Sequence, residues 1–299
     1  MAYNHLMGEN RLVVVYHPDF ALYGFTVLRE RLEPAFRALQ ESGCLDRPGV
    51  KVVEPVPVDE ELVRRVHTPG HIRGVLSSGY YEVSLLSAGA VALGAEEVAS
   101  DRADAAFCFV GAAGHHASRD GFWGFCYLND VAIAVEDLRG KGLAGRFAII
   151  DIDPHFGDGT RDILGPDPGV LHVNFYGGYK EEGQSGPSNH DFQLPWDCGD
   201  ELFLAGVEKA VRLAEDFRPD LLFVIFGHDG HADDYGAFEL TGEAYGRFAA
   251  RVKQAFPRRV CYVLSGGSNP RVAREAVSRV IDRLSSPPGS SPGVENGAG

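Results

Sequence analysis

The sequence predicts a single-domain α/β protein, in which two layers of helices enclose a mainly parallel β-sheet in a three-layer α/β/α arrangement. Short apolar runs alternate along the chain with longer amphipathic stretches, as in folds built from strand–helix units. Several of the short runs are apolar on both faces, which is typical of parallel strands covered by helices. The polar residues that could carry chemistry are concentrated directly after four of these runs.

Six segments have the composition of buried strands. Each is rich in apolar residues and is followed within two positions by a residue that favours a turn. In chain order these segments are residues 12–16, 105–110, 147–152, 170–175, 221–226 and 260–264.

Amphipathic patterns with helical spacing lie between the predicted strands. We predict helices at about residues 27–42, 58–66, 84–99, 127–140, 201–216, 241–255 and 271–284. Thr26, Asp200 and Thr241 are suitable N-caps for three of them, because their side-chain oxygens can accept a backbone N–H. The alternation of strands and helices implies right-handed crossovers and a doubly wound sheet.

The composition favours one large domain. With 299 residues, of which 44% are hydrophobic, the chain can bury a sizeable core. There is no internal repeat and no change of composition that would mark a linker, so we expect one domain over residues 10–285. Residues 286–299 are rich in Ser, Pro and Gly, and we expect them to form a disordered tail.

The net charge of −14 argues against a nucleic-acid or anionic-membrane partner, because phosphate contacts need clustered Lys and Arg residues. No apolar stretch reaches the length of a transmembrane helix, and the N-terminus lacks the basic and then apolar order of a signal peptide. The five Cys residues are scattered and form no CxxC motif. We therefore expect a reduced, cytoplasmic protein. The oligomeric state stays open, a homo-oligomer included.

Four predicted strands lead into segments that combine Gly with His, Asp or Ser residues. These segments are residues 111–116, 151–160, 227–231 and 265–268. In doubly wound sheets, ligands bind beyond the carboxyl ends of the strands. Glycine lets backbone approach closely there, while His and Asp supply ligands and bases. We therefore expect the four segments to form one site.

Asp153 and His155 are predicted metal ligands. They stand two residues apart in an extended segment, so their side chains point to the same side. Asp229, which follows another strand, is the natural third ligand. Zinc suits two carboxylates and one imidazole, although iron(II) or cobalt(II) also fits. The alternative is that residues 151–160 form only a polar turn between a strand and a helix.

His115 and His116 are candidate general acid and base groups. A metal-activated water needs a base, the leaving group needs an acid, and imidazole titrates near neutral pH. Asp151 and Asp158, which flank the predicted ligands, would orient the two rings. The alternative is that the histidines are surface residues or are themselves metal ligands.

Longer motifs surround these residues. They are Gly114-His115-His116-Ala117, residues 124–134 (GFCYLNDVAIA), residues 151–160 (DIDPHFGDGT), residues 227–236 and, more weakly, Tyr16-His17-Pro18-Asp19. In these motifs the chain resembles the histone deacetylase and acetylpolyamine amidohydrolase family of the arginase–deacetylase fold, over about residues 11–284. The resemblance implies about eight strands in the sheet, two more than the apolar runs reveal.

The resemblance implies the same roles for the site residues: zinc ligands at Asp153, His155 and Asp229, and an acid–base pair at His115 and His116 with partners Asp151 and Asp158. It also implies that Phe125 and Tyr176 line the substrate channel. Phe122 and Trp123 either add aromatic bulk at its mouth or pack under the loop. A structural monovalent cation, usually potassium, is implied at oxygens near Asp151, Asp153, His155, Asn174 and Phe175.

One departure from the family concerns the oxyanion. Active members usually carry a tyrosine after the last pair of glycines, and its hydroxyl stabilises the negative oxygen opposite the zinc. Ser268 occupies this oxyanion position here, and loss of one such donor typically costs about 10²–10³ in rate. Three residues are considered as replacement donors: Asn269, Tyr235 and His231. Phe156 replaces a second histidine of the family motif, but it is not a predicted ligand.

The sequence therefore predicts a zinc-dependent amidohydrolase that removes an acetyl or other acyl group from a small cationic acyl-amine, such as an acylated polyamine, or from acyl-lysine. The alternatives are a catalytically weak acyl-amine-binding protein and a specialised amide or ester hydrolase of metabolism, because Ser268 replaces the tyrosine. The two-manganese chemistry of the arginase branch is not expected. It needs further carboxylates, and Asp233 and Asp234 are expected to be solvated loop charges.

Overall fold

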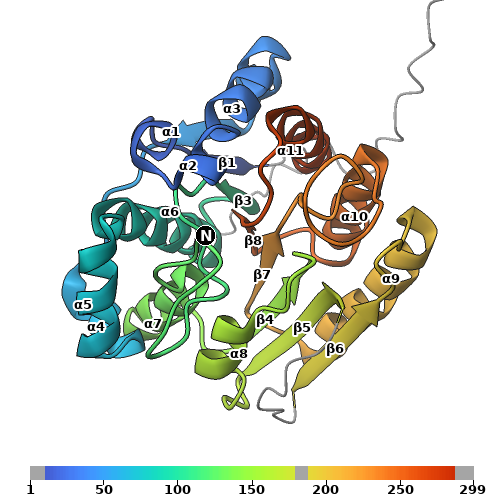
Figure 1. Ribbon diagram of the computed structural model, residues 1–299. Helices are drawn as coiled ribbons and strands as arrows, with labels where there is room; N and C mark the ends of the chain where they lie inside the picture. The colour runs from blue at the N-terminus through green and yellow to red at the C-terminus, as the bar shows by residue number, and fades with distance from the viewer. Residues whose placement is uncertain (1–10, 179–187, 287–299) are drawn as a thin grey trace, which may run out of the picture.

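Eight strands form one sheet across the middle of the molecule (Figure 1). The computed structural model describes residues 11–178 and 188–286. The strands lie in the order β2-β1-β3-β8-β7-β4-β5-β6, and every neighbouring pair is parallel. Their bounds are β1 Leu12–Val15, β2 Val50–Val53, β3 Ala105–Cys108, β4 Phe147–Asp151, β5 Val170–Gly177, β6 Asn189–Leu194, β7 Leu221–Phe226 and β8 Val260–Leu264.

All six strands predicted from apolar runs are present, and their ends differ from the prediction by no more than two residues. The two strands that the pattern does not reveal, β2 and β6, are the edges of the sheet. Both are only partly buried. An edge strand with a solvated face does not need apolar side chains throughout, so its sequence carries a weaker signal.

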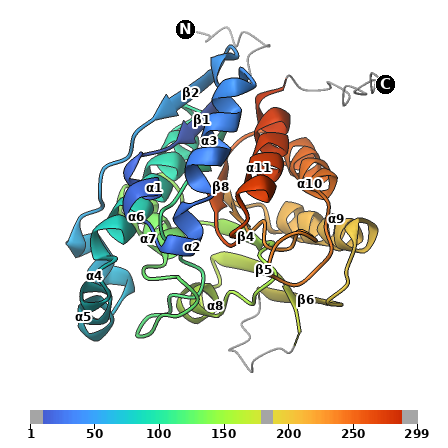
Figure 2. The same ribbon diagram turned by 45° about the horizontal axis from the view of Figure 1, so that its top comes forward.

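Helices cover both faces of the sheet, which confirms the predicted three layers (Figure 2). On one face α3, α11, α10 and α9 pack side by side, and on the other α5, α6, α7 and α8 do. The bounds are α1 Asp19–Tyr23, α2 Thr26–Arg29, α3 Leu32–Glu41, α4 Glu60–Val66, α5 Pro69–Ser78, α6 Tyr81–Ala99, α7 Asp130–Gly140, α8 Asp158–Leu164, α9 Asp200–Phe217, α10 Gly242–Ala255 and α11 Pro270–Ser285.

Each of the seven predicted helices is present, with α2 and α3 together in the first of them. Thr241 occupies the N-cap position of α10 as predicted, but its hydroxyl donates to Asp200 and accepts no capping N–H from the described residues. The helices α2 and α9 already begin at Thr26 and Asp200. The helices α1, α5 and α8 were not predicted, although the sequence of α5 carries the signals. Thr68 caps its first turn, Pro69 is its first residue, and Gly79 ends it.

The four strands whose ends carry the polar segments are neighbours in the centre of the sheet, in the order β3-β8-β7-β4. Because parallel strands end at the same edge, the segments that follow them meet there. Among the residues that the structure describes, no helix is long and apolar enough to cross a membrane. The predicted disordered tail, except for Ser286, lies outside the described residues.

Candidate metal centre

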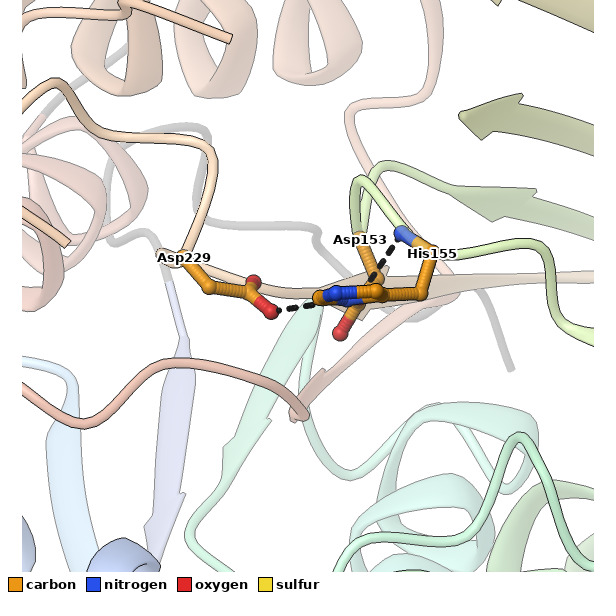
Figure 3. A group of neighbouring side chains, drawn as sticks. All are labelled: Asp153, His155 and Asp229. Atoms are coloured by element: carbon orange, nitrogen blue, oxygen red, sulfur yellow. Dashed lines mark hydrogen bonds and ion pairs between the residues drawn. The ribbon is translucent and has the colours of Figure 1, made fainter. Parts of the chain in front are cut away.

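Asp153, His155 and Asp229 come together at the C-terminal edge of the sheet (Figure 3). Their ligand atoms lie within 4.8 Å of one another. Nδ1 of His155 is 2.9 Å from Oδ1 of Asp153 and 3.1 Å from Oδ2 of Asp229. Strand β4 ends at Asp151, so Asp153 and His155 reach the same point from a bend that follows the strand and not from the extended segment that the sequence suggested.

The two carboxylates have different surroundings. Oδ2 of Asp153 accepts hydrogen bonds from the backbone N–H of Gly266 at 2.9 Å and from the hydroxyl of Ser265 at 3.2 Å. Neither oxygen of Asp229 accepts a hydrogen bond from the described residues, apart from its close ion-pair contact with His155. Both side chains are fully buried. A buried carboxylate without donors is unfavourable, and a bound cation would offset that cost.

The charges at this point also favour a cation. Burial raises the pKa of Asp229 to about 6, and the negative charge of Asp153 acts in the same direction. Burial lowers the pKa of His155, but hydrogen bonds to Asp153 and Asp229 and their charges outweigh burial and raise this pKa to about 11. The two carboxylates therefore create a strongly negative potential at Nδ1 of His155, the position that a divalent cation would share.

Two glycines leave room beside the carboxylates. A Cβ at Gly227 would lie 2.6 Å from Oδ1 of Asp229 and 2.7 Å from Oδ2 of Asp153. A Cβ at Gly266 would also collide with both side chains. The strand ends after β7 and β8 therefore require glycine at these positions. Two buried carboxylates and one partly exposed imidazole in such a cradle fit zinc, and iron(II) or cobalt(II) matches the same donors.

His115 and His116 lie beside the metal ligands, and a carboxylate holds each ring from behind. Nδ1 of His115 is 3.0 Å from Oδ2 of Asp151, and Nδ1 of His116 is 2.6 Å from Oδ1 of Asp158. The ring centroids are 4.0 Å apart. Nε2 of His115 is 3.7 Å from Oδ2 of Asp153. Both histidines are buried, so the alternative that they are surface residues is excluded.

The surroundings give the two histidines different charges. Burial lowers the pKa of His115, but the charges of Asp153 and Asp151 outweigh it and raise the pKa to about 9. Burial and the positive charge of His115 lower the pKa of His116 to about 4, although Asp158 acts in the opposite direction. At neutral pH, His116 is therefore a neutral imidazole that can accept a proton, and His115 is an imidazolium ion.

Trp123 completes the surroundings of His116. The two rings stack with centroids 3.8 Å apart, and Nε1 of Trp123 donates to Oδ2 of Asp158 at 2.8 Å. Phe122, by contrast, packs under the loop against Tyr127, at a centroid distance of 5.5 Å. The two adjacent aromatic residues thus have different roles. No local sequence pattern predicts the hydrogen bond from Trp123 to Asp158, because the two residues are 35 positions apart.

A cavity of about 210 Å³ lies over the metal ligands and the histidine pair. Phe125, which is predicted to line the substrate channel, lines this cavity and stacks on Phe25 at a centroid distance of 4.3 Å. The other predicted channel residue, Tyr176, is buried and packs against Phe156 at a centroid distance of 5.3 Å. Tyr176 is not among the described residues that line the cavity.

Ser268 is turned to Asp234. Its hydroxyl donates to Oδ1 of Asp234 at 3.0 Å, and its backbone N–H donates to the same oxygen at 3.0 Å. The expectation that Asp234 is a solvated loop charge is wrong, because its side chain is fully buried and accepts a hydrogen bond from the ring of His228 at 2.9 Å. Asp233 next to it is exposed. The sequence could not show that Asp234 is buried and Asp233 exposed, because the burial of Asp234 depends on contacts with the loop after β8.

The residues expected around a structural cation adjoin one another. Asp151 of β4 pairs with Asn174 of β5. Oδ1 of Asn174 accepts the N–H of Gly157 at 2.9 Å, and its Nδ2 donates to the carbonyl oxygen of Phe175 at 3.1 Å. The side chains of Asp151, Asn174 and Phe175 are fully buried. A potassium ion beside them, close to Asp153 and His155, stays a prediction.

Residues 27–284 match the histone deacetylase domain family. The matched region covers most of the chain and includes every residue of the metal centre and the histidine pair. The chain belongs to the histone deacetylase family. A crystal structure of the HDA15 HD domain has the same fold, with a TM-score of 0.83 and 21% sequence identity over 92% of this chain and 89% of that one.

Three curated relatives are similar at comparable identity. A probable deacetylase of Archaeoglobus fulgidus is 30% identical over 270 residues, which cover 80% of this chain and 75% of that protein. Histone deacetylase 5 of Arabidopsis thaliana is 30% identical over 243 residues, 74% of this chain and 37% of the relative. Acetylpolyamine amidohydrolase 1 of Pseudomonas aeruginosa is 31% identical over 199 residues, 62% of this chain and 57% of the relative. Because the three identities are almost equal, sequence identity alone does not indicate which of these relatives this chain resembles most in function.

Proposed function

We propose that the chain is a zinc-dependent amidohydrolase that removes an acetyl or other acyl group from an amine. Its substrate would be a small cationic acyl-amine, such as an acylated polyamine, or an acyl-lysine residue. One observation carries the proposal. Three candidate metal ligands line the same cavity as two histidines, each of which contacts a carboxylate through Nδ1. The family supports it, since the relatives include deacetylases and an acetylpolyamine amidohydrolase.

Asp153, His155 and Asp229 would hold the metal ion. Zinc bound by such residues lowers the pKa of a water molecule towards neutrality and polarises a carbonyl group. The hydrogen bonds that Asp153 accepts from Ser265 and Gly266 fix the direction of its carboxylate. A structural potassium ion, as the family resemblance implies, would lie near Asp151 and Asn174.

His116 would act as the general base. Its Nε2 accepts a proton from the attacking water, while Asp158 holds the proton on Nδ1 at 2.6 Å. The same Nε2 can then donate that proton to the leaving amine. His115, whose Nδ1 is held by Asp151 at 3.0 Å, would donate from Nε2 and stabilise the negative charge that develops between these two transfers.

Aromatic side chains would guide the substrate. Phe125 and Trp123 line the cavity, and Phe25 stacks behind Phe125. Such walls contact methylene groups well, so an extended aliphatic chain that ends in an acyl-amide fits between them.

The five cysteines are free thiols, which is in keeping with the reducing cytoplasm as the place of action.

The test is turnover of a panel of N-acyl amines by the purified, zinc-loaded protein. The panel should include acylated polyamines, acyl-lysine peptides and acyl chains of several lengths. We expect hydrolysis of at least one member, and loss of this activity after chelation. His116→Ala should lower kcat by about 10²–10⁴-fold without releasing the metal. Full zinc occupancy with no turnover of any acyl length would contradict the proposal.

A second candidate is an acyl-amine-binding protein with weak turnover. The observation that favours it is the orientation of Ser268, whose hydroxyl is bound to Asp234 and not free for a substrate. Calorimetric titration with the same panel separates the candidates, because a binding protein would give saturable heats without product. A specialised hydrolase of metabolism would instead turn over a non-acetyl amide or an ester.

A further inference from the structure

Three side chains of the loops after β7 and β8 that could supply the oxyanion donor are engaged elsewhere. The hydroxyl of Ser268 donates to Asp234 at 3.0 Å. The side chain of Asn269 caps α11 and donates to the carbonyl oxygen of Asp233 at 2.8 Å. Nδ1 of His231 accepts the N–H of Asp233 at 3.0 Å. None of the three is among the described residues that line the cavity.

Tyr235 does line the cavity, together with the metal ligands and the histidine pair. Its ring centroid is 5.9 Å from that of His155. Burial raises the pKa of Tyr235, and the charges of Asp229 and Asp153 raise it further, although the N–H of Gly267 acts against them. Tyr235 therefore shares the cavity with the candidate metal ligands, although 48% of the residue is exposed to solvent.

Asp234 fixes the loop that carries Tyr235. Its carboxylate accepts the N–H of Tyr235 at 2.9 Å, the N–H of Ser268 at 3.0 Å and the N–H of Asn269 at 3.1 Å. The ring of His228 pairs with it from the other side at 2.9 Å. Asp234 thus joins the loop after β7 to the loop after β8. The same carboxylate keeps Ser268 turned away from the cavity and holds the backbone next to Tyr235 in place.

We propose that Tyr235 is the catalytic residue that donates a hydrogen bond to the carbonyl oxygen of the substrate. The inference rests on the proposed amide hydrolysis. As water adds to the carbonyl carbon, the C–O double bond becomes single and the oxygen gains negative charge. The phenolic hydrogen of Tyr235 stays on its own oxygen, so no proton is transferred in this contact. The donor comes from the loop after β7 and replaces the tyrosine that the family carries at the position of Ser268.

The first test is Tyr235→Phe, which removes the hydroxyl and keeps the ring. We expect kcat on the best N-acyl amine to fall by about 10²–10³-fold, with KM changed less than about threefold and the zinc content unchanged. Tyr23→Phe is the matched control, because Tyr23 lies on α1 and is 65% exposed. A kcat of Tyr235→Phe within about threefold of the wild type would overturn the assignment.

The second test does not depend on turnover. A simple aliphatic hydroxamate presents a carbonyl oxygen to the same donor, and its Kd for the zinc-loaded protein can be measured by calorimetry. We expect Tyr235→Phe to bind it about 3- to 10-fold more weakly than the wild type and Tyr23→Phe to bind it equally well. Equal Kd values for the wild type and Tyr235→Phe would overturn the assignment. If the wild type binds the hydroxamate but hydrolyses no N-acyl amine, the proposed function fails, while the ratio of the Kd values still decides the role of Tyr235.

Discussion

Replacement of Asp158 by Asn should weaken His116 as a base. The carboxylate lies 2.6 Å from Nδ1 of a histidine whose side chain is 4% exposed. A charge-assisted hydrogen bond of this kind contributes about 1.5–3 kcal/mol. Since about 1.4 kcal/mol is a factor of ten, Nε2 of His116 should bind a proton about 10- to 100-fold less tightly. The side chain of Asp158 is 31% exposed, so screening by solvent favours the lower part of this range.

The variant should change both the rate and the pH profile. We expect kcat to fall by at least about 10-fold, and by up to about 10⁴-fold if proton transfer is lost altogether. Asp158 raises the pKa of His116. Its removal therefore lowers this pKa, so the acidic limb of kcat/KM moves to lower pH.

The assay is the hydrolysis of one N-acyl amine by zinc-loaded protein between about pH 3 and pH 9, so that it extends below the pKa of His116. Asp162→Asn is the matched control, because it makes the same chemical change one turn further along α8. Among the described residues, the carboxylate of Asp162 accepts a hydrogen bond from the backbone N–H of Arg119 and not from a histidine. A kcat of Asp158→Asn within about threefold of the wild type, or an acidic limb displaced to higher pH, would refute the role of His116 as the base.

Three further changes should have distinct effects. Gly227→Ala places a methyl group against both buried carboxylates, so the zinc retained after desalting should fall well below that of the wild type while the circular dichroism spectrum is kept. Trp123→Phe keeps the stacking on the histidine but loses the hydrogen bond to Asp158, and kcat should fall by about 3- to 10-fold in the same hydrolysis assay. Arg161→Leu breaks a buried ion pair with Asp191, so the free energy of unfolding in urea should fall by about 3–5 kcal/mol; an unchanged midpoint would contradict this.

The central part of the fold could be predicted because its strands are buried on both faces. β7 and β8 are continuous apolar runs and β4 is apolar up to its last residue, Asp151; each was identified with its first residue correct. β6 could not be identified, since it contains Asn189, His190 and Asp191 and has a neighbour on one side only. The order of the strands is set by packing between distant segments and is not contained in any local pattern.

The grouping of the candidate metal ligands could be predicted because their chemistry is unusual at the end of an apolar strand. Asp153, His155 and Asp229 are ionisable residues that follow apolar strands in Gly-containing segments, and the structure brings them together. The burial of Asp234 could not be predicted in the same way, and the sequence could only name Tyr235 as one of three candidate donors. Both lie in a loop whose conformation depends on contacts with residues more than thirty positions away, such as the N–H of Ser268.

The most direct test of the metal centre is the zinc content per chain. Wild type and Asp229→Ala should be incubated with a small excess of zinc, desalted and measured by mass spectrometry of the metal. We expect close to one tightly bound zinc for the wild type and a large loss for Asp229→Ala, because that variant removes a buried carboxylate whose oxygens have no other donor among the described residues. Equal zinc content in the two proteins, or none in either, would contradict the assignment of Asp153, His155 and Asp229 as the metal site.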